Sequence, residues 1–569
     1  MSRSEAAELS RSAARSEDTR IAATLLALLS VFVLFHGLGG AALFDPDEGR
    51  NAEIAREVLL TNDWITPYYD FLPRLEKPML FYAATALSYK IFGVSEAAAR
   101  FPSAAAALGV LLLTVFFTRR VYGERAALWS GLVLVTCVQF TSFARIVILD
   151  MMLAFFITLA LIAYYHASHA AARAEKRRYY FMMYAAAAAA TLVKGPIGFV
   201  LPGMIVVAYI AARRKWSSIA EMDLGWGLLI FLLIVTPWYA WAELRRPGYL
   251  AYFLGQEHFT RYLTAHFHRT KPWYYFFGVV ALGFIPWTFL LPSIVSRLRK
   301  TMDDLSLYAL LWAVVPFVFF SFSSSKMSEY LLPIYPALAI LAGKTLADAA
   351  GRWGLRWLSL GWLILGAVVF YLFLGVFLPA LLPPEAAEPL RELPRGEILA
   401  AALIAALFLL WTAWTSFQGQ HERLFPLCCV ALAVVFFLAH RVVERVSVAR
   451  SYKELGVQAA ARIASEDPAA PVVLYGTYLP SLLFYLDVSE PARIVAQDSD
   501  EEILGSFYLS AKKPAPAPGY ETPLLTYEEF DREWSSRKLF VFVKDKRLFE
   551  LHGARVLLRS ANVTLVTNR

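Results

Sequence analysis

The sequence predicts an α-helical, multi-pass membrane protein with a small α/β domain at its C-terminus. Apolar residues make up 58% of the chain, aromatic residues 15%, and the mean hydropathy is +0.51. This composition is typical of a protein whose solvent is largely lipid. The apolar pattern stops after Arg441. We therefore expect a polar cytoplasmic N-terminal tail over residues 1–20, a membrane domain over 21–440, and a domain outside the membrane over 441–569.

About 13 apolar segments are long enough to cross the hydrocarbon core of a bilayer. The first lacks a clean small-residue cleavage site, so we expect it to be retained as a helix and not removed as a signal peptide. The expected spans are residues 21–43, 97–118, 125–143, 146–167, 179–193, 196–213, 222–243, 273–296, 305–322, 329–347, 354–382, 396–416 and 424–440.

A further apolar segment, residues 78–92, is short and carries Lys90. If this segment lies at the interface, every second connection between spans is basic, and all of these connections share the side of the N-terminus. The positive-inside rule makes that side cytoplasmic. If the segment crossed, the basic clusters would fall on both sides, so we predict that it does not cross. The basic connections are Arg119, Arg120 and Arg125; Arg173, Lys176, Arg177 and Arg178; Arg213, Arg214 and Lys215; Arg297, Arg299 and Lys300; Lys344, Arg352 and Arg356; and Arg423.

The net charge of +8 does not indicate a nucleic-acid partner, because the basic residues lie in these short connections. The three cysteines, Cys137, Cys428 and Cys429, all fall in apolar segments, which excludes a disulfide framework and a thiolate zinc site. After Arg441, short strand-like runs at 471–475, 539–543, 555–558 and 563–566 alternate with helical or turn-rich pieces. They predict the α/β domain on the non-cytoplasmic side.

The loop Asp45-Pro46-Asp47-Glu48-Gly49-Arg50 directly follows the first span. Ionisable side chains are costly at such a depth, so this cluster of carboxylates with Arg50 is a functional-site hypothesis. The apolar spacing from Glu48 to Leu60 predicts an amphipathic helix along the interface. Asp45 has the alternative role of an N-cap for that helix. Three carboxylates exceed what one cap requires.

Three further polar groups are predicted on the same face of the membrane. Glu76-Lys77-Pro78 stands at the foot of the 78–92 segment, where Lys77 either snorkels to lipid headgroups or neutralises a leaving phosphate. Arg145 and Asp150 flank an outer turn; they form either a structural ion pair with each other or a second wall of the pocket. Lys194 lies in the turn Lys194-Gly195-Pro196.

The later loops add histidines and hydroxyl donors. The spacing of His258, His266 and His268 in residues 255–275 matches no closed zinc site, although Glu76 with His258 would suit one weakly held divalent ion. In SSSKMSEYLLP, Lys326 and Tyr330 stand at the outer mouth of a span, as donors to a phosphate or as ordinary interface anchors.

The motifs resemble, in this order, those of the aminoarabinose transferase family of bacterial inner-membrane glycosyltransferases, relatives of the protein O-mannosyltransferases with the GT-C fold. The resemblance covers most of the membrane region. It is carried by DPDEGRNAEIARE with NDWITP, LEKP, ARIVILD, LVKGPIG, QEHFTRY with HRTKPWYY, and KMSEYLLPIYP.

The resemblance implies transfer of a sugar, 4-amino-4-deoxy-L-arabinose, from undecaprenyl phosphate to lipid A at the periplasmic face of the inner membrane. It places the family's essential first-loop aspartate on Asp47 and its second periplasmic aspartate on Asp150, which together form the expected catalytic pair. The other implied positions are Arg50, Lys77, Tyr330 and Lys326 at the lipid phosphate, Glu48, Arg145 and Lys194 in support, and Glu76 with His258 at a divalent-metal site.

Asp47 would orient the sugar if the acceptor is an anionic phosphate, or act as a general base if the acceptor is a hydroxyl. One departure is Ser328, which stands where the family pattern KLPxY has a proline. The runner-up is a related transferase that acts on another lipid, a glycan or a protein. A transporter is the alternative from another class, but transporters usually show internal repeats and polar groups at mid-membrane, which this sequence lacks.

Overall fold

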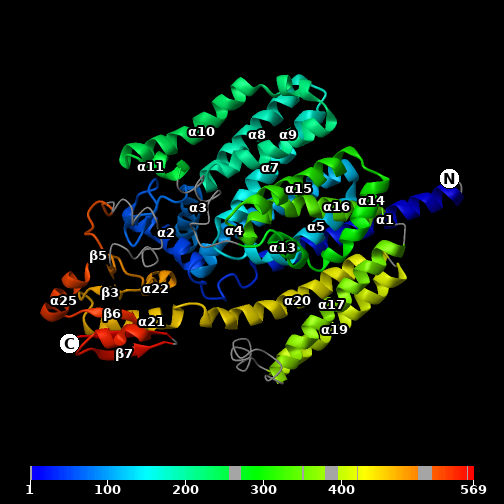
Figure 1. Cartoon of the computed structure of the whole chain (residues 1–569). Helices are drawn as coiled ribbons and strands as arrows, with labels where there is room; N and C mark the ends of the chain where they lie inside the picture. Colours follow the sequence, from blue (N-terminus) through cyan, green and yellow to red (C-terminus); the bar gives the residue numbers. More distant parts are fainter. Residues whose placement is uncertain are drawn as a thin grey trace.

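The computed structural model describes residues 3–255, 271–348, 352–377, 395–419, 421–496, 515–560 and 562–569. Apolar helices form most of the molecule, and a six-stranded sheet lies at the end opposite to the N-terminus (Figure 1).

Seven helices of the described part are long and apolar enough to cross a membrane, by length and composition. This finding confirms the prediction that the protein is helical and crosses the membrane several times. The seven are Glu17–Phe35 of α1 (Arg3–Phe35), α4 (Glu96–Tyr122), α7 (Leu149–His169), α10 (Leu224–Arg245), α15 (Asp304–Phe322), η4 (Ser328–Ile334) with α16 (Tyr335–Asp348), and Arg423–Ala449 of α20 (His421–Ala449).

Two of the expected spans are bent helix pairs and not continuous helices, and counting each pair as one span raises the number to nine. Helices α5 (Glu124–Thr136) and α6 (Val138–Ala144) meet at 64° around Cys137, whose backbone is extended. Helix α13 (Tyr275–Gly283) meets the helical segment Trp287–Lys300 at 102°. That break contains Pro286, which has no N–H to continue a helix.

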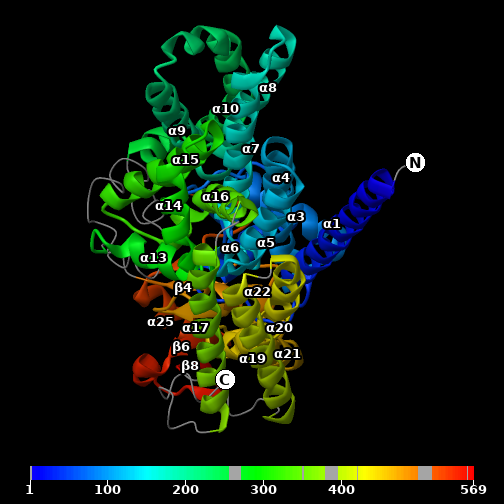
Figure 2. The ribbon, with the colours of Figure 1, turned by 90° about the vertical axis from the view of Figure 1, so that its right-hand side faces the viewer.

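The other expected spans coincide with four helices outside the seven. They are α8 (Arg173–Lys194), α9 (Ile197–Arg213), α17 (Arg352–Phe377) and α19 (Arg395–Gln418). The total of about 13 spans therefore stays a prediction. Helices α17, α19 and α20 pack side by side (Figure 2). The short segments η1 (Trp216–Met222), α11 (Tyr249–Ala251), η3 (Trp287–Leu290) and α14 (Leu291–Lys300) complete the membrane part.

The basic connections between helices form ion pairs with nearby acids. Arg173 contacts Asp223 at 2.6 Å, and Arg213 contacts Asp304 at 3.0 Å. Arg297 reaches Asp348 at 3.0 Å. These pairs join connections that the charge pattern assigns to one side of the membrane.

The segment after the first span forms α2 (Asp47–Thr61), the hairpin β1 (Tyr68–Tyr69) and β2 (Leu72–Pro73), and α3 (Leu80–Phe92). At 13 residues, α3 is about 20 Å long and too short to cross a bilayer. The position of α2 along the membrane interface stays a prediction. The helix is buried over nearly its whole length, because α3 packs on it from the membrane side and α22 (Pro480–Leu486) from the C-terminal unit.

The C-terminal unit is built on a sheet with the strand order β5-β4-β3-β6-β8-β7. Strands β5, β4, β3 and β6 are parallel, and β8 and β7 are antiparallel. Strands β4 and β5 escaped prediction because they contain only three and two residues. The strands are β3 (Val472–Tyr475), β4 (Arg493–Val495), β5 (Leu524–Leu525), β6 (Phe540–Lys544), β7 (Arg555–Arg559) and β8 (Val563–Thr567), with helices α21 (Lys453–Glu466), α25 (Tyr527–Ser536) and η6 (Asp545–Glu550).

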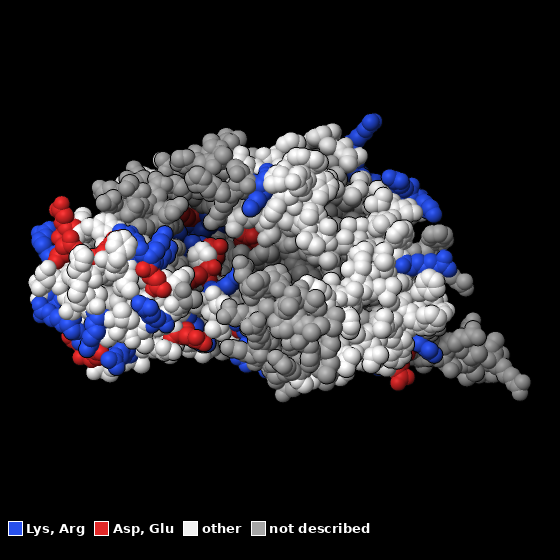
Figure 3. Space-filling model, turned by 60° about the horizontal axis from the view of Figure 1, so that its bottom comes forward, with Lys and Arg blue, Asp and Glu red and all other residues white. Residues whose placement is uncertain are grey.

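Charged side chains gather over this C-terminal unit, whereas the visible part of the helical body is mostly uncharged (Figure 3). The unit therefore has the surface of a domain in water, and the helices have that of a domain in lipid.

Candidate active site

The start of α2 is held in place by a buried ion pair. Glu48 receives two hydrogen bonds from Arg100 of α4, at 2.8 and 2.9 Å, and both side chains are only 3% exposed. The same carboxylate accepts from the backbone N–H of Phe44 at 3.0 Å and of Val147 at 2.9 Å. Glu48 thus joins the first loop, α4 and the turn before α7. These contacts hold the start of α2, which also carries the neighbouring residues Asp47 and Arg50.

Asp45 does not cap α2, so that alternative is wrong. Its carboxylate accepts from the N–H of Ser481 at 2.7 Å and from the Ser481 hydroxyl at 2.8 Å, at the start of α22 in the C-terminal unit. Burial raises the pKa of Asp45 to about 6, and the bonds from Ser481 and the charge of Arg50 oppose that shift. The residue fastens the first loop to the C-terminal unit.

Asp47 and Arg50 form an ion pair one helical turn apart on α2. The Asp47 side chain is 46% exposed and that of Arg50 is 19% exposed, so the carboxylate is the more accessible partner. Burial lowers the pKa of Arg50, but the neighbouring Tyr478, Asp47 and Tyr82 outweigh burial and the net shift is upward. The guanidinium therefore stays charged.

Arg74 and Tyr82 belong to the same cluster as Asp47 and Arg50, and they were not predicted as site residues from the sequence. Tyr82 of α3 is buried, and its nearest charges are Arg50, Arg74, Glu76 and Asp47. Burial raises the pKa of Tyr82 to about 12. The phenol stays neutral and donates to the side-chain oxygen of Asn51 at 3.4 Å. A sequence signal existed, because Arg74 stands two residues before Glu76 in the same polar loop.

The second wall of the site consists of Asp150, Lys194 and the segment around Tyr330. Asp150, at the start of α7, accepts from Lys194 at the end of α8 at 2.5 Å. The Lys194 ammonium also lies 5.0 Å from the centre of the Tyr330 ring, within cation–π distance. The structure therefore brings three of the predicted residues together from three helical segments.

Glu329 links the two walls and was not predicted as a site residue. It is buried, and its charged neighbours include Asp150, Lys194 and Asp47. The Ser328 hydroxyl, which replaces the family proline, donates to its carboxylate at 3.3 Å. The sequence feature that could have identified Glu329 is that it is the one acidic residue in KMSEYLLP. Asp47, Asp150 and Glu329 therefore lie near one another, accompanied by the cations Arg50 and Lys194.

Arg145 does not pair with Asp150 and does not line the site. Its guanidinium donates to the carbonyls of Val33 at 2.8 Å and His36 at 2.6 Å, at the end of α1. It also lies over the Phe436 ring at 4.9 Å. The direct Arg145–Asp150 pair is therefore wrong, because Lys194 is the cation that reaches Asp150. Arg145 supports the fold by fastening the turn before α7 to α1.

The remaining predicted cations have local contacts. The Lys77 ammonium donates to the carbonyl of Glu76 at 2.9 Å. Lys326 is buried and donates to the carbonyl of Ser323 at 2.6 Å, so it stabilises its own turn. The Glu76 carboxylate lies 3.7 Å from Arg74.

A metal site is not formed by the described residues. Within the described ranges no group of three or more His, Cys, Asp or Glu side chains is arranged to hold a metal ion. His258, the predicted partner of Glu76, lies outside the described residues. Glu76 by itself supplies too few ligands for a divalent ion.

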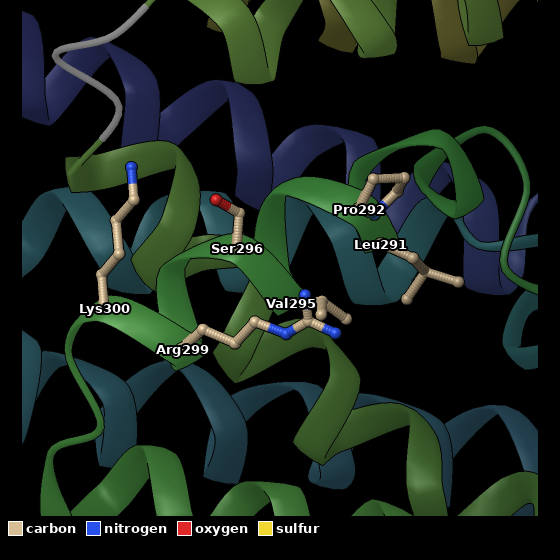
Figure 4. Close-up of a pocket in the computed structure, with 6 residues that line it drawn as sticks. All are labelled: Leu291, Pro292, Val295, Ser296, Arg299 and Lys300. Carbon is tan, nitrogen blue, oxygen red and sulfur yellow. The ribbon is translucent and has the colours of Figure 1, made fainter.

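The molecule also has a surface hollow on α14, lined by Leu291, Pro292, Val295, Ser296, Arg299 and Lys300 (Figure 4). None of these residues belongs to the cluster around Arg50. The hollow lies on one of the basic connections and not at the candidate active site.

The fold and the site define a class: a multi-pass membrane protein with the GT-C fold, whose polar cluster lies between the helices and a C-terminal α/β unit. A family model described as dolichyl-phosphate-mannose-protein mannosyltransferase matches residues 76–241. The crystal structure of ArnT from Cupriavidus metallidurans bound to undecaprenyl phosphate is similar with a TM-score of 0.83 and 27% identity, over 96% of this chain and 98% of that one. The apo structure of the same protein gives a TM-score of 0.78 at 26% identity.

The relatives found by sequence include aminoarabinose transferases as well. An undecaprenyl phosphate-alpha-4-amino-4-deoxy-L-arabinose arabinosyl transferase of Aeromonas salmonicida is 31% identical over 333 residues, which is 57% of this chain and 60% of the relative. One with the same description from Shewanella sediminis is 29% identical over 58% of this chain and 60% of its own length. The chain thus spans about 60% of the length of these relatives. The resemblance to the aminoarabinose transferases and the GT-C fold are confirmed.

Proposed function

We propose that this protein is a glycosyltransferase that moves 4-amino-4-deoxy-L-arabinose from undecaprenyl phosphate to lipid A at the periplasmic face of the bacterial inner membrane. The observation that carries the proposal is the cluster of Asp47, Arg50 and Arg74 against the Asp150–Lys194 pair. The cluster occurs in a chain similar over 96% of its length to an ArnT bound to undecaprenyl phosphate.

In the proposed reaction an oxygen of the acceptor bonds to the anomeric carbon of the sugar. The bond from that carbon to the phosphate oxygen breaks, and undecaprenyl phosphate leaves with the bonding electrons. Arg50, Arg74 and Lys77 would stabilise the charge that grows on the departing phosphate, since cations make charge-assisted bonds to phosphate oxygens. Besides stabilising this charge, the cluster has to align the donor and the acceptor.

The accessible carboxylate of Asp47 would orient the sugar or stabilise developing positive charge when the acceptor is a phosphate of lipid A, which carries no proton to remove. With a hydroxyl acceptor, Asp47 would instead accept the proton. The acidic group formed by Asp47, Asp150 and Glu329 suits a sugar that carries an ammonium.

A related transferase that acts on another lipid, a glycan or a protein is the second candidate. It is favoured by the match of residues 76–241 to a protein mannosyltransferase family. Both candidates use a polyprenyl phosphate sugar as donor and differ in the acceptor. A transporter is disfavoured because the charged side chains gather at the ends of α7 and α8 and in the first loop, and not in the middle of spans.

The test is transfer by the purified chain in nanodiscs. Undecaprenyl phosphate aminoarabinose is supplied with lipid A, with a peptide or with another lipid, and products are identified by mass spectrometry. Aminoarabinose on lipid A with wild-type protein, and none with Asp47→Asn, is the expected result. Product only on a peptide or another lipid would favour the second candidate. No transfer to any acceptor would overturn both.

A further inference from the structure

The C-terminal unit contributes a loop to the cluster around Arg50. Residues 476–479 connect β3 with α22, and Ser481 in the first turn of α22 holds Asp45. The fit is close: a Cβ added at Gly49 would lie 2.5 Å from the Ser481 Cα. Only a residue without a side chain fits here, so the first loop and this loop touch backbone to backbone.

Tyr478 is the residue of this loop that reaches the cations. Arg74 donates to the Tyr478 hydroxyl over a long distance of 3.5 Å. Arg50 is a charged neighbour of the same residue, because Tyr478 is among the groups that raise the pKa of Arg50. The Tyr478 ring packs edge-on against Tyr69 at 5.6 Å between centroids, which fixes the direction of the phenol.

One phenol oxygen thus faces two guanidinium groups, one from α2 and one from the loop after β2. Two like charges drawn to one point repel each other unless an anion joins them. Asp47 pairs with Arg50, and the Glu76 carboxylate lies 3.7 Å from Arg74. A phosphate beside Tyr478 would bond both guanidinium groups at once.

The place of Tyr478 in the sheet also favours a binding role. The chain passes from β3 to β4 and β5 on one side and then returns to β6 on the other side of β3. Ligands of open parallel sheets usually bind beyond the carboxyl ends of the strands where the order reverses in this way. The loop that carries Tyr478 follows the carboxyl end of β3.

We propose that Tyr478 is a positioning residue for the donor: its hydroxyl holds Arg50 and Arg74 at the spacing of one lipid phosphate, so the C-terminal unit completes the donor site. This rests on the proposed function, in which the donor is a polyprenyl phosphate sugar. The unit is then part of the site and not only a cover for it.

The experiment compares Tyr478→Phe with wild type and with a matched control, Tyr485→Phe. Tyr485 lies in the same unit, and its hydroxyl accepts from the N–H of Leu43 at 2.8 Å without belonging to the Arg50 cluster. Two quantities are measured in nanodiscs: the Kd for undecaprenyl phosphate itself, and the donor KM, acceptor KM and kcat of transfer. Thermal unfolding of each variant checks the fold.

Tyr478→Phe should weaken undecaprenyl phosphate binding and raise the donor KM by about three- to tenfold, the effect of one lost hydrogen bond, with the acceptor KM unchanged. Tyr485→Phe should leave both donor values at the wild-type level. In an Arg50→Ala background, Tyr478→Phe should add less than it does alone, because both changes affect one contact.

Wild-type donor binding in Tyr478→Phe, or an equal loss in Tyr485→Phe, would overturn the inference. If wild type binds undecaprenyl phosphate through Tyr478 but transfers no sugar, the proposed transfer fails and the positioning role stands. If Tyr478→Phe unfolds, Tyr478→His, which keeps a ring nitrogen able to accept a hydrogen bond, is measured in its place, and its failure to bind undecaprenyl phosphate contradicts the role.

Discussion

Lys194 donates a hydrogen bond of 2.5 Å to Asp150, which joins the end of α8 to the start of α7 beside the first loop. The two side chains are 17% and 5% exposed. A charge so far removed from water depends on its partner, so removing either side chain leaves the other without compensation.

Removing one partner of this pair should destabilise the protein more than removing both. Asp150→Ala strands the Lys194 ammonium, at a cost of about 3–5 kcal/mol, whereas the double variant Asp150→Leu with Lys194→Leu should recover most of that loss. Thermal unfolding in nanodiscs measures this. The double variant should still be inactive; normal transfer by it would show that the pair is only structural.

Asp47→Asn should abolish transfer and leave the fold intact, because it keeps the size of the side chain and removes the charge that orients sugar or acceptor. Asp45→Asn should be milder in activity, since Asp45 contacts Ser481 and not the open side of the site. Steady-state transfer together with thermal unfolding separates the two. Equal loss of activity from both variants would contradict these roles.

Asp45 should make stability depend on pH between about 4 and 6. Its pKa rises from 3.8 to about 6 in the folded protein, so the folded state binds more protons than the unfolded state in this window. The stability that Asp45 contributes is thus fully present below pH 3.8 and is lost as pH rises through 6.

The measurement for Asp45 is the free energy of unfolding of wild type minus that of Asp45→Asn, from denaturant titrations between pH 4 and 8. This difference should fall up to pH 6 and then level off. A difference that rises over the same range would show that burial does not dominate at this carboxyl.

Arg50→Ala and Lys77→Ala should each impair use of the donor more than use of the acceptor. Each charge-assisted contact to phosphate is worth about 1.5–3 kcal/mol, so each loss should slow transfer roughly tenfold to a hundredfold. The two effects should be less than additive because both cations face one phosphate. Separate titrations of donor and acceptor decide this: an unchanged donor dependence with a collapsed acceptor dependence would move the phosphate site elsewhere.

The topology predicts that both ends of α3 face the periplasm. Cysteines introduced at Asn62 and Val94, which are exposed, should react with an impermeant maleimide in intact cells with a permeabilised outer membrane. Lys215→Cys, in an exposed basic connection, is the protected control. The native cysteines are buried and should stay silent. Labelling at Asn62 with protection at Val94 would show that residues 78–92 cross the membrane.

The sequence by itself determined the membrane helices and the positions of Asp47, Arg50, Asp150 and Lys194. Both are local signals: twenty apolar residues are needed to cross lipid, and an ionisable residue at that depth is conspicuous because it is costly. Breaks within spans were less visible, and the one at Cys137 has no proline or glycine to mark it.

Only the tertiary structure decided which partner each polar group takes. Asp45 bonds a serine 436 positions away, and Asp150 bonds a lysine 44 positions away although Arg145 is closer in sequence. Such pairs depend on how helices and sheet pack, and no local pattern encodes that. For the same reason Tyr478, in a unit without a recognisable motif, emerges as a neighbour of Arg50 only when the C-terminal sheet is placed against α2.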